Sequence, residues 1–416
     1  MRESKGLEFK ESVSATFLKT VSAFANYGGG RILFGVADDG AAVGLGNPEQ
    51  ACLDIENRIN DCITPNPDYS LAVNADATVS LTVAEGLHKP YLYKAKAYKR
   101  NGTATIAVGS AELSRLVLEG SNLDFEDLPS RTGRLSFSVL EGALCEKTGI
   151  SGLDDDVLRT LELENRRGEL NIAAELLADE NSFPGVDAVR FGDSVNVFLD
   201  RVSTERVSVL TQYDAAVEMY GKYYQYEEIV GSRREARELV PEAAFREALA
   251  NALVHREWDA RANVRVSMHP DRIEVVSPGS LPRGISEQEY LSGRISSLRN
   301  PILGNVFFRL GLMERFGTGV LRIKESYASS ARKPRFHVGE NSITVVLPTQ
   351  GDADDLSPDE RAVLDALTAS ELPMSEITKR SGFGKTKCQG ILTSLIQNGY
   401  ASKVGNGRGT RYRRSM

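Results

Sequence analysis

The sequence is poor in cysteine and tryptophan and has no long apolar run. Its 416 residues include four cysteines, which stand far apart, form no CxxC pair and therefore predict neither a zinc site nor a disulfide framework. No apolar run approaches the roughly 18 residues that a membrane-spanning helix needs. The first residues are charged, unlike those of a signal peptide. We therefore expect a cytoplasmic protein without a membrane partner.

The composition is typical of a soluble globular protein, with 41% apolar and 26% charged residues. A chain of this length exceeds one ordinary core, which predicts about two to four domains. The net charge of −7 is unevenly distributed. Residues 372–416 contain nine basic residues and one acid, a local charge of +8 that leaves −15 for the rest of the chain. Such an asymmetry indicates a nucleic-acid-binding end.

Periodicity and breaker residues predict an α+β multidomain protein. The first segment has a mixed α/β pattern, with a helix over 12–27, a glycine turn at 28–30 and a strand over 31–36. Because the glycines follow a helix and precede a strand, we expect a structural tight turn rather than a phosphate-binding loop. The second segment is expected to be a connecting α/β region, and its residues 134–235 have no chemical signature. The four segments are 1–120, 121–235, 236–350 and 356–416.

Three carboxylates can gather near the N-terminus. Glu3 and Glu8 precede the first helix, and Asp38 follows the strand over 31–36; Asp39 is the alternative to Asp38 because the register is loose there. Hard divalent cations such as Mg²⁺ or Mn²⁺ bind carboxylate oxygens and stabilise the charge on a phosphate under attack. The alternative is that Glu3 and Glu8 serve the helix dipole or lie as solvated surface charges.

Basic residues alternate with tyrosines in the same segment. Such a pattern predicts cations that hold a nucleic-acid backbone and rings that stack on bases. The cations are Lys10, Lys89, Lys94, Lys96, Lys99 and Arg100, and the rings are Tyr91, Tyr93 and Tyr98.

Several motifs recur in order over residues 1–120: Glu3, the run 8–10, and the runs 22–26, 29–30, 34–36, 43–44 and 98–102. Together they resemble the Schlafen AlbA-type domain. This resemblance implies a metal-assisted RNA-cleaving site at Glu3, Glu8 and Asp38. Because only some relatives cut RNA, nucleic-acid contact without cleavage is the alternative.

A second constellation lies in the third segment. Glu247, Asn251 and His255 recur every four residues in a helix expected over 242–257, so they share one helix face. Together with the motifs at 271–282 and 315–319, they resemble the GHKL-type (Bergerat) ATP-binding module. Such modules stand beside AlbA-type domains in bacterial proteins described as transcriptional regulators. The fold implied for residues 236–350 is a Bergerat-like α/β sandwich.

The Bergerat resemblance implies ATP as a cofactor and assigns a role to each motif residue. Glu247 would activate water and Asn251 would hold Mg²⁺. Gly279 would lie in the loop near the base, and Gly317 and Gly319 in the phosphate lid.

One departure from the family pattern stands against ATP binding. The aspartate that grips adenine is expected at position 277, where this sequence has a serine. The alternative is a buried polar helix face in a module that no longer binds nucleotide, with His255 as a core histidine.

Residues 356–416 predict a winged helix, with helices over 358–368, 374–380 and 385–398 and a hairpin as the wing. The run 382–386 does not fit a phosphate-binding loop, because position 379 is a lysine where that pattern requires glycine. In a winged helix the third helix presents side chains to the major groove and the wing touches phosphate. The expected DNA contacts are Lys385, Lys387 and Gln389, and Arg408 and Arg411 in the wing.

We expect a DNA-binding transcriptional regulator, acting as a homodimer because winged helices usually read two-fold sites. A protein-docking role of the winged helix is the alternative at that domain. The competing function is a metal-dependent endoribonuclease that acts on structured RNA such as tRNA through Glu3, Glu8 and Asp38. A third candidate function is that of an active ATPase.

Overall fold

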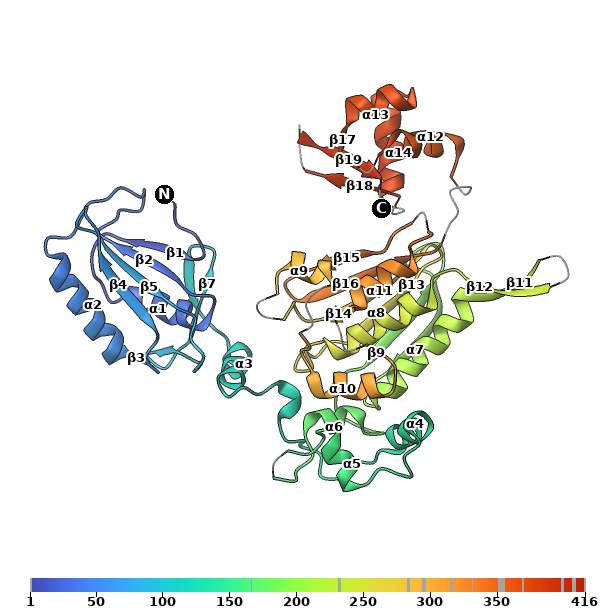
Figure 1. Ribbon diagram of the computed structural model, residues 1–416, viewed down its shortest axis with the longest axis horizontal. Coiled ribbons are helices and arrows are strands. Elements are labelled where there is room, and N and C mark those ends of the chain that lie inside the picture. Colours follow the sequence, from blue (N-terminus) through green and yellow to red (C-terminus); the bar gives the residue numbers. More distant parts are fainter. Residues whose placement is uncertain are drawn as a thin grey trace. The chain divides into compact units, whose positions relative to one another are not determined.

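The computed structural model describes residues 2–165, 167–230, 233–282, 285–293, 297–314, 317–330, 332–350, 356–368, 370–397, 400–405 and 409–414. The chain forms two compact units, Met1–Phe125 and Glu126–Met416, which Figure 1 shows in blue to cyan and in green to red. No helix in these ranges is both long and apolar enough to cross a membrane.

A four-stranded sheet forms the centre of the first unit, in the order β1-β2-β5-β4. β1 (Leu7–Lys10) and β2 (Gly30–Phe34) are parallel, whereas β5 (Val79–Val83) is antiparallel both to β2 and to β4 (Tyr69–Val73). Parallel neighbours need a crossover connection, and α1 (Phe17–Asn26) is that crossover. It starts later than the predicted residue 12 and is buried along almost its whole length.

The glycine turn after α1 is a structural turn, as the sequence predicts. Gly28 and Gly29 have φ angles of +71° and +68°, which side chains rarely allow. A Cβ atom on Gly29 would lie 2.9 Å from the Val83 carbonyl oxygen. The turn therefore lets β2 start directly against β5.

The remaining elements of the first unit are two short β-ladders and two helices. Asn47 caps the first of these helices by accepting the Gln50 N–H at 3.1 Å. The helices are α2 (Pro48–Cys62) and α3 (Ser110–Gly120), and the ladders pair β3 (Ile63–Thr64) with β6 (Leu92–Tyr93) and β7 (Tyr98–Asn101) with β8 (Ala104–Ala107).

A six-stranded sheet organises the second unit, in the order β10-β9-β13-β14-β16-β15. β9 is parallel to β13 and the other neighbours are antiparallel. Because β9 and β10 precede residue 236, the sheet extends across the boundary expected there, and the segment 121–235 is part of the central fold. The strands are β9 (Val186–Phe191), β10 (Phe198–Thr204), β13 (Val264–Met268), β14 (Arg272–Pro278), β15 (Arg335–Val338) and β16 (Ser342–Pro348).

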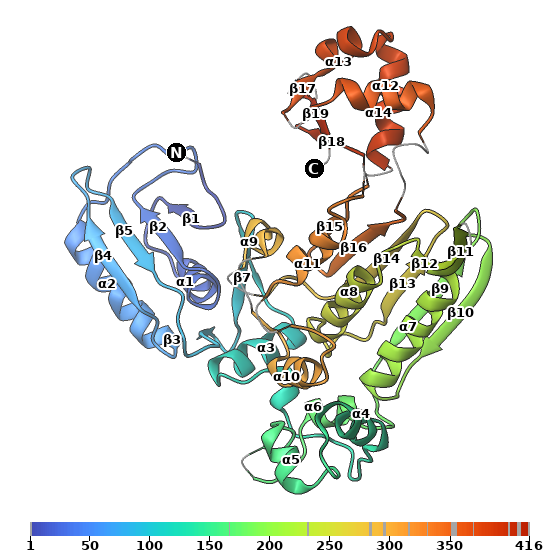
Figure 2. The ribbon, with the colours of Figure 1, turned by 45° about the vertical axis from the view of Figure 1, so that its right-hand side comes forward.

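Two long helices cover this sheet. α7 (Val209–Tyr224) packs on β9 and β10, and α8 (Glu242–Val254) packs on β14 and β16. The chain between them forms an arm, the hairpin of β11 (Gln225–Val230) and β12 (Arg233–Glu238), which stands away from the sheet in Figure 1 and is turned toward the viewer in Figure 2. The other helical elements are η1 (Phe125–Asp127), α4 (Ser138–Thr148), α5 (Asp155–Thr160), α6 (Ile172–Leu177), α9 (Glu287–Ser292), α10 (Pro301–Arg309) and α11 (Gly319–Ser326).

Three helices and a three-stranded sheet end the chain, with a small apolar core of their own that includes Leu364, Ile377, Leu392 and Leu395. The sheet has the order β17-β19-β18. Helix bounds agree with the predicted ones to within about two residues. The elements are α12 (Pro358–Ala366), β17 (Leu372–Pro373), α13 (Met374–Ser381), α14 (Lys385–Gln397), β18 (Ala401–Val404) and β19 (Arg411–Arg414).

Candidate functional site

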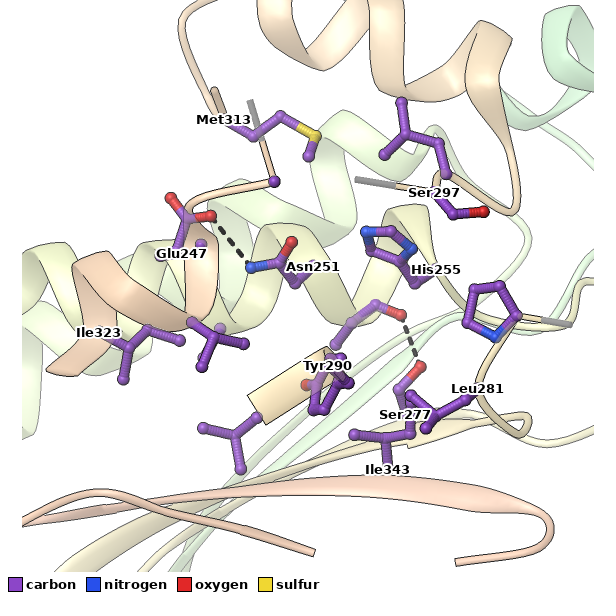
Figure 3. A pocket seen from close by; sticks show the side chains of 18 of the residues that line it. Glu247, Asn251, His255, Ser277, Leu281, Tyr290, Ser297, Met313, Ile323 and Ile343 are labelled. Carbon is purple, nitrogen blue, oxygen red and sulfur yellow. Dashed lines mark hydrogen bonds between the residues drawn. The ribbon is translucent and has the colours of Figure 1, made fainter. Parts of the chain in front are cut away.

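A pocket in the second unit is built around one pair on α8. Glu247 and Asn251 are four residues apart on the helix, and the Asn251 side-chain amide donates to Glu247 Oε1 at 3.0 Å (Figure 3). Burial raises the pKa of Glu247, although the Asn251 hydrogen bond and the nearby Arg322 act in the opposite direction. Glu247 is therefore an acid whose charge is stabilised by a few specific neighbours rather than by water.

The first residue of α11 lies directly on this pair. A Cβ atom on Gly319 would stand 2.5 Å from Glu247 Oε1 and 2.6 Å from Asn251 Nδ2, so a larger residue there would force these two side chains to shift. Gly317 lines the same pocket. Arg322, one turn further along α11, lies 3.8 Å from Glu247 and pairs with Glu314 at 3.2 Å. Helix α11 thus closes the pocket over the two polar residues.

The rest of the pocket is mostly apolar and small. Its walls come from α8, the sheet, α9 and α11, and they enclose about 90 Å³. Pockets for drug-sized ligands are typically about 300–1,000 Å³. The space that the described lining residues enclose is therefore smaller than a nucleotide needs. The apolar walls include Val275, Leu281, Tyr290, Met313, Ile323 and Ile343.

The structure explains what the serine at position 277 does. Its hydroxyl donates to the Ala252 carbonyl oxygen at 2.8 Å (Figure 3), so it ties β14 to α8. The serine side chain cannot supply the carboxylate that is expected at this position for binding adenine. The pocket therefore contains the Glu247–Asn251 pair expected from the Bergerat resemblance but no carboxylate at position 277.

His255 and Gly279 lie at the edges of this arrangement. α8 ends at Val254, earlier than predicted, and His255 follows as its C-cap while still lining the pocket. Burial and the nearby Arg299 lower the pKa of His255 to about 4, so the ring is neutral near pH 7. Gly279 has a φ of +120°, and a Cβ there would stand 2.8 Å from Glu257. It shapes the loop after β14 but does not line the cavity.

A second cavity, of about 260 Å³, lies in the first unit. Glu3, Glu8 and Asp38 all line it. Asp39 instead accepts the Ala41 N–H at 2.9 Å within its own turn, which favours Asp38 over Asp39 as the third acid. The cations and hydroxyls of the lining are Lys10, Lys19, Arg100, Thr16, Thr20, Thr103 and Thr105.

Glu8 is the buried centre of this cavity, and both of its oxygens have partners. Lys10 approaches Oε1 at 2.7 Å. Oε2 accepts from Arg100 and, at 2.7 Å, from the Thr20 hydroxyl. Glu3 accepts the Phe9 N–H at 2.8 Å. Among the described residues, no three His, Cys, Asp or Glu side chains lie close enough together to share a metal ion.

The donor set itself suits Mg²⁺ or Mn²⁺, because it consists of carboxylate oxygens. Lys10, however, holds the position beside Glu8 Oε1 that a cation would take. A metal held by Glu3, Glu8 and Asp38 would therefore require the Lys10 ammonium to swing away from Glu8.

Two parts of the predicted nucleic-acid surface of the first unit are wrong. Lys89 is buried and pairs with Glu85 at 2.5 Å and with Glu119, so its charge is neutralised inside the domain. The tyrosines at 91, 93 and 98 belong to the core and cannot stack on bases. The tyrosines occupy the positions of this alternating segment whose side chains face the core, where apolar surface is removed from water.

The other predicted cations of the first unit are accessible to different degrees. Lys99 pairs with Glu112 at 2.8 Å and is partly exposed. Lys94 and Lys96 are exposed, and the Lys94 ammonium lies 5.3 Å from the centre of the Tyr93 ring. Arg100 is buried against Glu8.

In the C-terminal helices, Lys385 and Gln389 are exposed on α14, and Arg411 is exposed on β19. Lys387 pairs with Asp359 at 2.6 Å and lies 4.1 Å from the Phe383 ring centre. Arg408 lies outside the described residues.

Sequence reasoning missed two arginines, one on β15 and one shortly before it, that contact the C-terminal elements. Arg335 on β15 donates to the carbonyl oxygens of Ile396 and Gln397, at 3.1 and 3.0 Å, which are the last carbonyls of α14. Arg332 donates to the Tyr400 hydroxyl at 2.9 Å. Cations at a helix C-terminus are favourable for its dipole. These contacts join residues far apart in sequence, so no local pattern indicates them.

Comparisons with known proteins give two family matches. Residues 3–109 match the family model "Schlafen, AlbA_2", and residues 261–347 match the family model described as "Putative ATP-dependent DNA helicase recG C-terminal". No curated protein matches the chain significantly. Among solved structures, the DIP2311 protein from Corynebacterium diphtheriae is 18% identical, with a TM-score of 0.47 and coverage of 99% of this chain and 95% of that one.

Substitution of Gly319 tests the seating of α11. We expect Gly319→Ala to destabilise the second unit by about 1–3 kcal/mol, because overpacking forces neighbours apart. Urea unfolding followed by the fluorescence of Trp258, the only tryptophan and a buried one, measures this. The matched control is Gly142→Ala on α4, where an added Cβ meets no atom within 4 Å. Equal stability of the two variants would contradict the close contact.

Removal of Glu8 tests the buried ion pair. We expect Glu8→Ala to cost about 3–5 kcal/mol, because Arg100 would remain buried without its carboxylate. Differential scanning calorimetry of the full chain resolves this as a lower transition temperature of the first unit. Glu112→Ala removes a partly exposed carboxylate that binds Lys99 and the Tyr27 hydroxyl, and it should cost less, about 1–2 kcal/mol. An unshifted transition in Glu8→Ala would show that the pair does not stabilise the fold.

Proposed function

We propose that this chain, a Schlafen-like protein with an AlbA-type domain and a second domain of the RecG C-terminal type, is a DNA-binding transcriptional regulator. The C-terminal helices and sheet act as a winged helix. The central pocket senses a ligand of the nucleotide class, and the protein binds DNA as a homodimer.

The observation that carries this proposal is the contact of α14 with the central sheet. The exposed Lys385 and Gln389 lie on α14, and its C-terminus is held by Arg335 of β15. β15 is the element that follows α11 in the chain, and α11 closes the pocket. A change at the pocket therefore has a short structural route to the helix that would enter the major groove.

ATP binding requires a rearrangement of α11. The closed cavity is smaller than a nucleotide needs, and Gly319 occupies the space against Glu247 and Asn251. Displacement of α11 would enlarge the pocket and loosen the Arg322 contact with Glu247. Bound Mg²⁺–ATP would supply a phosphate chain and a metal ion near this acid–amide pair. Because the base-reading carboxylate is missing, we propose sensing rather than turnover as the role of the site.

A second candidate, a metal-dependent endoribonuclease, is favoured by one observation. Glu3, Glu8 and Asp38 line a single cavity together with Lys10, Lys19 and Arg100. Carboxylates for a metal and cations for phosphate are the groups that such a reaction needs. The pairing of Glu8 with Lys10 and Arg100 counts against it, since both oxygens are already engaged.

Loss of two exposed cations tests DNA binding. We expect Lys385→Ala combined with Arg411→Ala to weaken duplex binding about tenfold at low salt. The slope of log affinity against log salt should fall by about 2, because two cations that neutralise the charge of the duplex are lost. Fluorescence anisotropy with a labelled duplex measures both. Arg159→Ala, which removes an exposed cation of α5, serves as the control. An unchanged slope in the double variant, or no wild-type binding at low salt, would contradict the proposal.

Cleavage of tRNA in the presence of Mn²⁺ tests the second candidate. Glu8 is unsuitable for substitution, because its removal would leave a buried positive charge without a partner and destabilise the fold. The informative change is therefore at the exposed Asp38. If the chain is a nuclease, Asp38→Asn abolishes cleavage seen with wild type, while Asp39→Asn retains it. Intact tRNA with wild-type protein over a full range of Mn²⁺ concentrations would exclude this candidate.

A further inference from the structure

Helix α14 has a face that is exposed and carries no charge. Its opposite side packs into the apolar core of the C-terminal elements. The exposed positions follow one another at helical spacing, so they lie on one face, and Gln389 stands beside them. All of these residues are exposed, and we call them the outward face: Thr386, Gln389, Gly390, Thr393 and Gln397.

The other sides of α14 are occupied by packing. Lys387 pairs with Asp359 of α12 at 2.6 Å. The Ser394 hydroxyl donates to Glu360 of α12 at 2.8 Å. The last carbonyl groups of the helix accept hydrogen bonds from Arg335. The described contacts therefore leave the outward face open along the helix before its C-terminal end.

The fold itself gives no reason for a glycine at position 390. In the interior of an exposed helix, glycine is less favourable than alanine because it loses more conformational freedom on folding. A Cβ atom on Gly390 would meet no atom of the described residues within 4 Å, and its φ lies outside the left-handed region that favours glycine. Glycine also allows a ligand to come close to the backbone. Such an approach accounts for the residue.

The surroundings of the outward face are basic. Residues 372–416 carry a net charge of +8, and the exposed cations include Lys385 at the start of α14 and Arg411 and Arg413 on β19. This charge attracts a polyanion. The neutral residues are of the types that contact base edges in the major groove, where glutamine binds adenine and the threonine methyl group contacts thymine.

Duplex DNA fits the outward face better than RNA or another protein does. The major groove of B-form DNA admits an α-helix, whereas that of A-form RNA is too deep and narrow for side chains to contact the bases. Protein interfaces depend on a few large anchors such as tryptophan, tyrosine and arginine. The outward face has no residue of these types.

We propose that Gln389 and Gly390 select adenine at one base pair of duplex DNA. The Gln389 side-chain amide donates to adenine N7, and its oxygen accepts from the N6 amino group. Gly390 lets the backbone of α14 lie close enough to the base edges for this pair of hydrogen bonds. The inference rests on the DNA-binding function proposed for this chain, and it names the residues and the base that give that function its specificity.

Substitution of Gly390 tests the close approach. The full chain first selects duplexes from a random-sequence library, and fluorescence anisotropy then measures its affinity for the selected duplex. Gly390→Ala is expected to bind at least about tenfold more weakly, because the methyl group holds the helix away from the bases. Its thermal unfolding should occur at the same temperature as that of wild type or higher, since alanine favours a helix.

The matched control is Gly142→Ala, which adds the same methyl group to the exposed interior of α4. There too the added Cβ meets no atom of the described chain within 4 Å. This variant should bind the selected duplex as wild type does. Weaker binding by Gly390→Ala alone, in a protein at least as stable as wild type, cannot come from a loss of folding.

Substitution of Gln389 tests the choice of base, with competitor duplexes that differ at a single base pair. Wild type should prefer adenine at one position, and Gln389→Ala should bind all four bases there within about twofold. Gln389→Glu should prefer cytosine at the same position, because a carboxylate accepts from the cytosine N4 amino group. A purely structural role of Gln389 would not change the preferred base.

The results separate this inference from the proposed function. If wild type binds the selected duplex and Gly390→Ala binds it equally well, or both Gln389 variants keep the wild-type base preference, the inference is overturned and DNA binding stands. If the library yields no selected duplex and wild type binds none at low salt, the proposed function fails and the inference fails with it.

Discussion

The contact of Gly319 with Glu247 and Asn251 is the constraint on which the second unit depends. It seats α11 on α8, reduces the pocket to about 90 Å³ and brings Arg322 within reach of Glu247. β15 follows α11 in the chain, and its Arg335 holds the end of α14. The glycine thus lies in the pocket wall, and the next strand along the chain contacts the C-terminal helices.

The two candidate sites use carboxylates in opposite ways. Glu247 is held by an amide and a distant guanidinium, and burial raises its pKa, so it can respond to a new ligand. Glu8 is enclosed by Lys10, Arg100 and Thr20. A carboxylate so fully paired first stabilises the fold, and chemistry there requires those pairs to open. This difference is why the pocket of the second unit, rather than the cavity of the first, carries the regulatory proposal.

The sequence predicted the local elements and the residues that share one helix or one turn, including the Glu247–Asn251 face and the glycine turn. Glu3, Glu8 and Asp38 line one cavity, but no three acids among the described residues lie close enough together to share a metal ion. The predictions failed where contacts between residues far apart in the sequence determine the structure. β9 joins β13 across a whole helix pair and an arm, so residues 121–235 gave no usable pattern. Lys89 and the three tyrosines were assigned to a surface because alternation does not reveal which face is buried. The contacts of Arg332 and Arg335 with the C-terminal helices have no sequence signal.

Hydrogen exchange measured by mass spectrometry, with and without Mg²⁺–ATP, addresses the central claim that α11 is a movable wall. The account predicts that saturating Mg²⁺–ATP changes amide exchange in α11 (Gly319–Ser326) and also at β15 and the end of α14, while exchange in α2 of the first unit stays the same. Identical exchange in α11 with and without the nucleotide would contradict it.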